Sequence, residues 1–139
     1  MGLLHPANWE KGFHSIVQPS AGQLRLLGLG ILSLQKGEAW EKSFEGLEAA
    51  LVVLGGRCEI RTARKHWPEV GERENVFSGR ATALYLPAGD RLKVNALGPL
   101  EAAVVTSPAS NRGEAVLIRP EDVAVRSVGA DNWRRSVQD

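Results

Sequence analysis

The chain has 139 residues, 43% of them hydrophobic, which is enough to close one hydrophobic core and predicts a single domain. Its 17 Lys and Arg residues nearly balance its 16 Asp and Glu residues, so a formal net charge of +1 provides no field that would attract nucleic acid or an anionic membrane. The single cysteine, Cys58, excludes an internal disulfide framework and a cysteine-based zinc site.

The first residues, Met-Gly-Leu-Leu-His-Pro, contain no basic stretch followed by a long apolar run. No later segment has the roughly 20 apolar residues that a membrane-spanning helix needs. We therefore expect a soluble cytoplasmic protein with no nucleic-acid or membrane partner. Cys58 is expected to be a small, half-buried strand residue, because no helix start or cationic neighbour is apparent that would lower its pKa.

Short apolar runs separated by Gly, Pro, Asn and Asp dominate the chain, and this pattern predicts an all-β sandwich or barrel with almost no helix. The first predicted strand covers residues 23–34. The aliphatic run 49–54 then stops at Gly55-Gly56, and residues 57–62 alternate between polar and less polar side chains. This combination predicts a hairpin with a glycine turn.

A second hairpin is predicted in the middle of the chain. Residues 83–86 lead into the turn 87–90, Pro-Ala-Gly-Asp, and residues 91–95 resume with strict alternation, which is typical of a half-buried strand. Residues 100–106 are the next predicted strand, and the polar, proline-containing segment 107–113 is predicted to be a loop.

The C-terminal quarter of the chain continues this pattern less regularly. Residues 115–118 are predicted to form a strand, residues 119–123 a loop or short turn, and a valine-rich segment that ends at Val128 a last strand. Residues 129–139 carry no further turn or strand signal, and we expect them to be the start of a linker.

Two segments resemble the sequence frame of metal-holding cupin barrels. The first half of that frame has a glycine, an H-x-H pair, a glutamate and a glycine six residues later; Gly37 stands at its start, Glu48 at the carboxylate position and Gly55 at its end. The second half is P-x-G followed by a histidine, and Pro87-Ala-Gly89 is present. Both halves in this order indicate a single cupin-type double-stranded β-barrel, or jelly roll.

The histidines of this frame are absent. Their positions are occupied by Lys42 and Phe44 or, with the other spacing, by Glu41 and Ser43, and in the second half by Leu92. A catalytic divalent ion needs about three converging protein ligands and an open position, which one carboxylate cannot supply. We therefore predict no metal, no cofactor and no catalytic residue in this chain, and expect Glu48 to be a strand-end or solvent-facing residue.

The histidines of the chain do not suggest a metal site either. His5, His14 and His66 are far apart, and the first two are predicted to lie outside the barrel strands, so no pair is expected to meet at a metal. His66, with Trp67 and Pro68, is predicted to lie in a loop that either lines a barrel mouth or, as we favour, packs locally.

Aromatic and guanidinium groups offer two further candidates for ligand binding. Four tryptophans are spread along the chain, namely Trp9, Trp40, Trp67 and Trp133. They could stack on a sugar, but lids on the core and interface anchors are the favoured interpretation. Arg134-Arg135 could hold a carboxylate, and the favoured alternative is that they are solvated or lie in a domain contact.

A resemblance to a known family runs nearly from end to end. It is carried by Leu3-Leu-His5 and by residues 49–56, 74–77, 83–89, 117–122 and 132–135. The most specific of these segments are Leu-Ile-Arg-Pro-Glu-Asp at 117–122 and Asn-Trp-Arg-Arg at 132–135. Through them the chain resembles the 5-deoxy-glucuronate isomerases of inositol catabolism, which are relatives of the uronate ketol-isomerases of pectin breakdown.

The resemblance implies a longer protein of two cupin barrels, in which a metal-free N-terminal barrel precedes a C-terminal barrel that carries the histidines and the glutamate. It also implies a metal-assisted aldose–ketose isomerisation of 5-deoxy-glucuronate to 5-dehydro-2-deoxy-gluconate through an enediol. Residues 1–139 resemble the first barrel only, with residues 129–139 as the start of an interdomain linker. No metal ligand or catalytic residue of the family maps onto this chain.

Three hypotheses are compatible with these residues. In the first, the chain is the N-terminal, metal-free half of such an isomerase, inactive alone, with a structural role in a homo-oligomer or against a second cupin barrel. In the second, it is a stand-alone, non-enzymatic cupin that binds a sugar acid or a protein partner, because a fold does not fix a function. In the third, it is a pure oligomerisation module, because an exposed surface is expected where a second barrel would pack.

Overall fold

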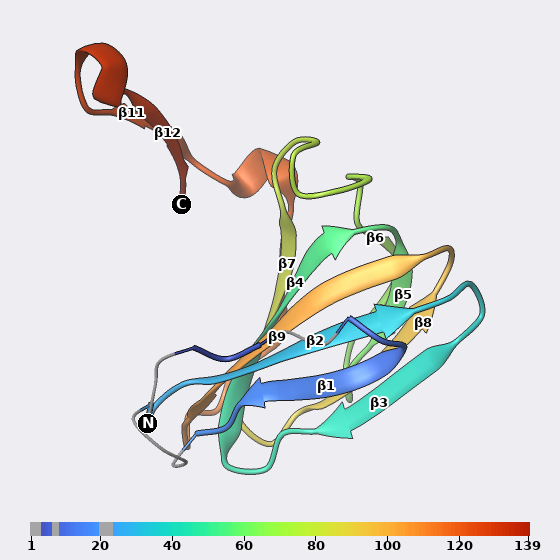
Figure 1. The fold of residues 1–139 in the computed structure, drawn as a ribbon. Coiled ribbons are helices and arrows are strands. Elements are labelled where there is room, and N and C mark those ends of the chain that lie inside the picture. Colours follow the sequence, from blue (N-terminus) through green and yellow to red (C-terminus); the bar gives the residue numbers. More distant parts are fainter. Residues whose placement is uncertain (1–3, 7–8, 20–23) are drawn as a thin grey trace.

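The computed structural model describes residues 4–6, 9–19 and 24–139, and two antiparallel β-sheets make up its barrel (Figure 1). The larger, six-stranded sheet has the order β1 (Gly12–Val17), β2 (Gly28–Leu34), β9 (Leu100–Pro108), β4 (Leu47–Gly55), β7 (Thr82–Leu86) and β10 (Val116–Ile118). The smaller, four-stranded sheet has the order β3 (Ala39–Ser43), β8 (Arg91–Ala96), β5 (Cys58–Arg61) and β6 (His66–Val70). The prediction of an all-β fold is confirmed.

The hydrophobic core lies between the two sheets. Alternate residues of a strand point to the same side of its sheet, and the apolar ones point toward the other sheet. In β4 the buried residues are Ala49, Leu51 and Val53, and in β8 they are Leu92 and its alternating neighbours. The alternation read from residues 91–95 therefore marks a half-buried strand, as predicted. In the described part of the chain, no buried side-chain nitrogen or oxygen lacks a hydrogen-bond partner.

Both predicted hairpins are wrong, although their strands exist. Strand β4 pairs with β7 and β9, whereas β5 pairs with β6 and β8, so the turn at Gly55-Gly56 carries the chain from one sheet to the other. Residues 87–90 do the same between β7 and β8. At Gly56 φ is +96°, and a Cβ there would lie 2.1 Å from the Pro99 carbonyl oxygen, so this crossing requires a glycine.

Within the two barrel sheets, three strands were not predicted, namely β1, β3 and β6, and all three are edge strands. Edge strands bury less surface and carry more polar residues than central ones, so their hydrophobic pattern is weak. His14 consequently lies in a barrel strand and His66 begins another, contrary to the prediction that both lie outside the strands. The strand predicted from residue 23 begins at Gly28; residue 23, like Leu3 of the resemblance, lies outside the described residues.

The C-terminal segment forms a separate two-stranded hairpin. A 3-10 helix, η1 (Pro120–Asp122), leads into β11 (Val125–Val128), and a second one, η2 (Asp131–Trp133), turns the chain into β12 (Arg135–Gln138), which pairs with β11. Figure 1 shows this hairpin standing away from the barrel. Residues 129–139 thus carry a strand that their sequence did not signal, and their role as a linker stays a prediction. No helix of the described residues has the length and apolar character to cross a membrane.

Candidate functional site

The two halves of the cupin-like frame meet in the structure. Phe44 follows β3, and its N–H donates to the carbonyl oxygen of Asp90 at 3.0 Å. In return, the Gly89 N–H donates to the carbonyl oxygen of Phe44 at 2.8 Å. The Pro-Ala-Gly turn and the end of β3 are therefore held together, as they would be if both supplied ligands to one ion.

The side chains at this junction do not fit a divalent metal. Phe44 and Leu92 are both 0% exposed and belong to the hydrophobic core. Lys42 lies opposite Leu92 in the β3–β8 pairing, and its Nζ is 4.8 Å from the ring centroid of Phe13 and 5.7 Å from that of Phe44. Hydrocarbon and an ammonium group thus occupy the inner side of the frame, where imidazoles or carboxylates would be needed.

The acidic and polar residues of the frame point elsewhere. Glu41 and Ser43 are exposed, on the outer side of β3. Glu48 is the second residue of β4 and, in the alternation of that strand, faces away from the core, which agrees with the predicted strand-end position. Its Oε2 accepts a hydrogen bond of 2.9 Å from the Tyr85 hydroxyl, which in turn accepts one of 2.5 Å from Asn111 Nδ2.

The described residues contain no group of three or more His, Cys, Asp and Glu side chains that could hold a metal ion. Among the histidines, His5 is exposed, and His14 Nε2 lies 3.1 Å from the Lys11 carbonyl oxygen. His66 Nε2 lies 2.7 Å from Glu59 Oε1. The residues present therefore do not fit a catalytic metal, and the absence of one from this chain stays a prediction.

Glu59 is the centre of a polar cluster on the four-stranded sheet. Its carboxylate accepts hydrogen bonds from Asn95 Nδ2 at 3.0 Å and Arg61 Nε at 2.8 Å, besides its contact with His66. The hydrogen bonds from Asn95 and Arg61 hold the pKa of Glu59 below its ordinary value. Because both carboxylate oxygens are already engaged, we interpret this cluster as a structural one.

The tryptophans divide into two packed and two exposed residues. Trp40 stacks on Phe13, with ring centroids 5.0 Å apart, and Trp67 packs against the core. Trp9 and Trp133 are 54% and 78% exposed.

The remaining two predictions concern Cys58 and the arginine pair. Cys58 was expected to be half buried, but it is fully buried in β5, and burial raises the pKa of its thiol to about 12. Arg134 and Arg135 are exposed on the C-terminal hairpin.

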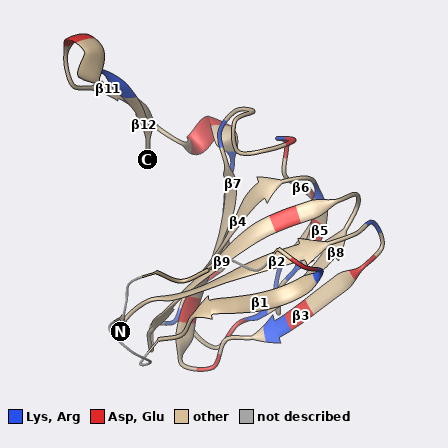
Figure 2. Ribbon diagram, in the orientation of Figure 1, with Lys and Arg blue, Asp and Glu red and all other residues tan. Residues whose placement is uncertain are grey.

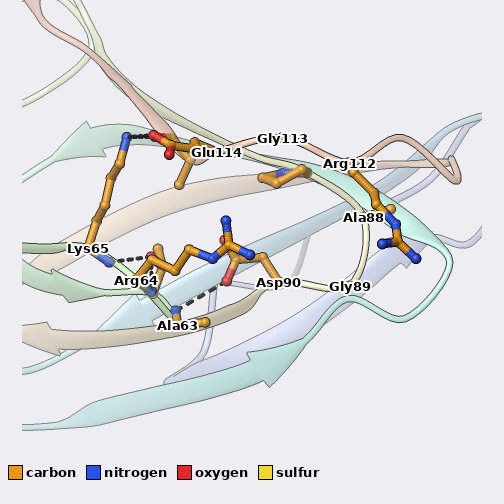
Figure 3. Close-up of a pocket in the computed structure, with 12 residues that line it drawn as sticks. Ala63, Arg64, Lys65, Ala88, Gly89, Asp90, Arg112, Gly113 and Glu114 are labelled. Carbon is orange, nitrogen blue, oxygen red and sulfur yellow. Dashed lines mark hydrogen bonds and ion pairs between the residues drawn. The ribbon is translucent and has the colours of Figure 1, made fainter.

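A cleft of about 440 Å³ opens beside the turn that carries the second half of the frame (Figure 3). Three segments line it, residues 62–65 between β5 and β6, residues 87–90 between β7 and β8, and residues 112–115 before β10. Sequence reasoning singled out the middle segment but missed Arg64 and Arg112 in the other two. Loop residues carry no hydrophobic period, and these two are 48 positions apart, so only the fold reveals that they share a cleft.

Both carboxylates in this cleft have partners. Asp90 Oδ1 accepts hydrogen bonds from the N–H groups of Ala63 at 3.2 Å and Arg91 at 2.7 Å. Glu114 Oε2 lies 2.9 Å from Lys65 Nζ, and this hydrogen bond holds the pKa of Glu114 below its ordinary value. The two acidic groups of the cleft are thus committed to the protein itself.

Comparison with known proteins places this geometry in a family. The model of the KduI/IolB family matches residues 3–139. The 5-deoxy-glucuronate isomerase of Geobacillus thermodenitrificans is 34% identical over 134 residues, which cover 96% of this chain and 48% of that protein. The corresponding enzyme of Geobacillus kaustophilus is 33% identical, over 92% of this chain and 47% of its own length. The chain therefore spans about half the length of the curated relatives that it matches.

Solved structures agree. An IolB-like protein of Salmonella typhimurium LT2 superposes with a TM-score of 0.91 and 27% identity, covering 99% of this chain and 53% of that one. The cupin domain of Schizosaccharomyces pombe Cnp3 superposes with a TM-score of 0.53 and 12% identity, over 70% of this chain and 60% of that one, which supports the cupin fold alone. The chain belongs to the KduI/IolB family.

Proposed function

We propose that this chain is the metal-free barrel of a 5-deoxy-glucuronate isomerase and that its role there is structural. The observation that carries the proposal is that Phe44 and Leu92, at two histidine positions of the cupin frame, are fully buried core residues. The isomerisation would then take place in a second, metal-bearing barrel. The match to about half of each relative supports this division of labour.

The outer face of the six-stranded sheet is the surface that fits an assembly role. One apolar row crosses all six strands through Val17, Leu29, Val105, Ala50, Tyr85 and Val116. A neighbouring row consists of Ala103, Val52, Ala83 and Ile118, together with the half-buried His14 and with Ile31, which this chain already buries. Figure 2 shows the central strands of this sheet almost free of charged residues. We call these two rows the outer apolar face.

An antiparallel sheet with one side in water normally has polar residues on that side. An extended apolar face instead marks a surface that another element covers. We take a second β-barrel of the same fold as its occupant, because the relatives have about twice the length of this chain and sheets pack face to face through such surfaces. Residues 129–139 would lead toward that barrel, and the cytoplasm is the compartment that we expect.

An isomerase assay of the purified chain with 5-deoxy-glucuronate, combined with a measurement of bound divalent metal, tests the proposal. The expected result is no turnover and no stoichiometric metal, while the relative from Geobacillus thermodenitrificans is active in the same assay. Turnover by this chain together with one tightly bound divalent ion would overturn the proposal, because it would require ligands that the frame does not supply.

The second candidate function is that of a stand-alone barrel that binds a sugar acid without chemistry. The cleft with Arg64 and Arg112 favours it, because guanidinium groups suit carboxylates. Calorimetric titration with uronates distinguishes a binding protein, which gives a saturable heat, from a purely structural barrel, which gives none.

A further inference from the structure

The C-terminal hairpin, which we call the arm and which comprises residues 124–139, is ordered within itself. In the described part of the chain, its strands β11 and β12 pair only with each other. The backbone groups of Ala124 and Asp139 close its base with two hydrogen bonds of 3.1 and 2.9 Å. At its tip, the Trp133 N–H donates to the Ala130 carbonyl oxygen at 2.9 Å. The arm is therefore a preformed element.

The barrel holds the start of the arm but not its body. Arg80 Nη1 donates to the carbonyl oxygens of Pro120 at 3.3 Å and Val123 at 3.2 Å, which fixes the segment that leads into the arm. Beyond it, no hydrogen bond or ion pair joins the arm to any other residue that the structure describes, and Figure 1 shows it standing away from the barrel. A lone two-stranded hairpin is only marginally stable in water, and this one leaves Trp133 and Val125 exposed. The arm thus has the properties of an element that packs on another molecule.

The arm and the outer apolar face have complementary charges. Arg134 and Arg135 are exposed on the arm, and neither makes a side-chain hydrogen bond or ion pair with another described residue. The six strands of the larger sheet contain no Lys or Arg and two carboxylates, Glu48 and Glu101, both on the outer side. Glu48 binds the Tyr85 hydroxyl, whereas Glu101 has no partner among the described residues. A cationic, aromatic segment therefore suits this face.

The arm leaves the sheet at the end where Glu101 lies. Ile118, the last residue of β10, shares a row with Ala103 of β9, and Glu101 is the next outward residue of β9 in the direction of the arm. When two such sheets pack face to face about a two-fold axis parallel to their strands, equivalent ends of the two sheets meet. The arm of one copy then starts beside the end of the other sheet that bears Glu101.

We propose that, in a dimer formed through the outer apolar face, the arm of each copy clasps the sheet of the other copy. Trp133 packs on the apolar rows, and Arg134 and Arg135 face Glu101. The inference rests on the assembly role proposed above. Tryptophan and arginine are the residues that most often anchor protein interfaces. The superposed part of the IolB-like protein covers 99% of this chain, so the arm has a counterpart there.

Sedimentation equilibrium of the full chain, which gives the dissociation constant of the dimer, tests the proposal. The variants W133A, R134E/R135E and E101R should each raise that constant at least about tenfold. Combining E101R with R134E/R135E restores opposite charges, so the constant should return toward the wild-type value. The control K93E reverses an exposed charge on the four-stranded sheet and should dimerise like the wild type.

The outcomes separate this inference from the proposed function. A dimer with an unchanged constant in W133A and R134E/R135E, or no recovery in the combined variant, would overturn the clasp and leave the assembly role intact. A monomeric wild type would also overturn the clasp, and the isomerase assay still tests the proposed function by itself.

Cysteine cross-linking decides if circular dichroism shows that a variant does not fold. Cys58 is fully buried, so it does not interfere. Under mild oxidation a mixture of E101C and R135C must give a disulfide-linked dimer, which neither variant gives alone. The absence of that dimer would exclude the contact.

Discussion

Replacement of Phe44 by alanine tests the idea that packing has taken the place of a metal centre. The Phe44 side chain is 0% exposed, among the largest of the fully buried ones, and stands where the cupin frame has a histidine. Truncation of a buried phenylalanine removes its burial energy and leaves a cavity, which together cost about 3–5 kcal/mol. Phe77 is 94% exposed, so Phe77→Ala is a matched control that should change stability by about 0.5 kcal/mol or less.

Urea unfolding followed by tryptophan fluorescence measures the difference. With a urea slope of about 2 kcal/mol per M, the Phe44→Ala midpoint should fall by about 2 M, whereas the Phe77→Ala midpoint should hardly move. Phe44→Leu should lie between the wild type and Phe44→Ala, because it keeps most of the apolar contact. A loss below about 1 kcal/mol for Phe44→Ala would refute the reasoning, since the site of the absent ligand would then not be part of the core.

Three further predictions concern Cys58, Glu59 and the outer apolar face. In the folded protein Cys58 should resist thiol reagents at pH 8 that label it in urea, and rapid labelling without urea would contradict its burial. The free energy of unfolding should fall as pH rises from the ordinary thiol pKa of 9.0 toward about 12, because in this range the thiol is ionised only in the unfolded chain. Because the pKa of Glu59 is lowered, its contribution to stability is present above the ordinary carboxyl pKa and is lost as pH falls through the lowered value. In unfolding curves at decreasing pH, Glu59→Gln should therefore lose less stability than the wild type. Equal losses in the two proteins would argue against this contribution. In the purified chain a second copy should cover the outer apolar face, so sedimentation velocity should give a dimer. Val52→Glu, within that face, should disrupt the dimer, whereas Ser43→Glu, outside it, should preserve it. A monomeric wild type at high concentration would count against this interface.

The sequence by itself determined the fold class and the lack of imidazoles in the cupin frame. Alternation with period two fixes which side chains of a strand are buried, so the strands in residues 49–54, 83–86 and 91–95 could be placed. The sequence also places Phe44 and Leu92 at histidine positions of the frame, and neither side chain has an atom that can ligate a metal.

Only the tertiary structure decided which strands pair and which loops meet. The pattern of β4 and β5 is the same whether they form a hairpin or cross between two sheets, because alternation specifies a face and not a partner. The weakly apolar edge strand β3 pairs with β8, a neighbour distant in sequence, so its conformation depends on a contact that its own residues do not signal. Arg64 and Arg112 share a cleft for the same reason: the two sheets close on each other and bring separate turns to one end of the barrel.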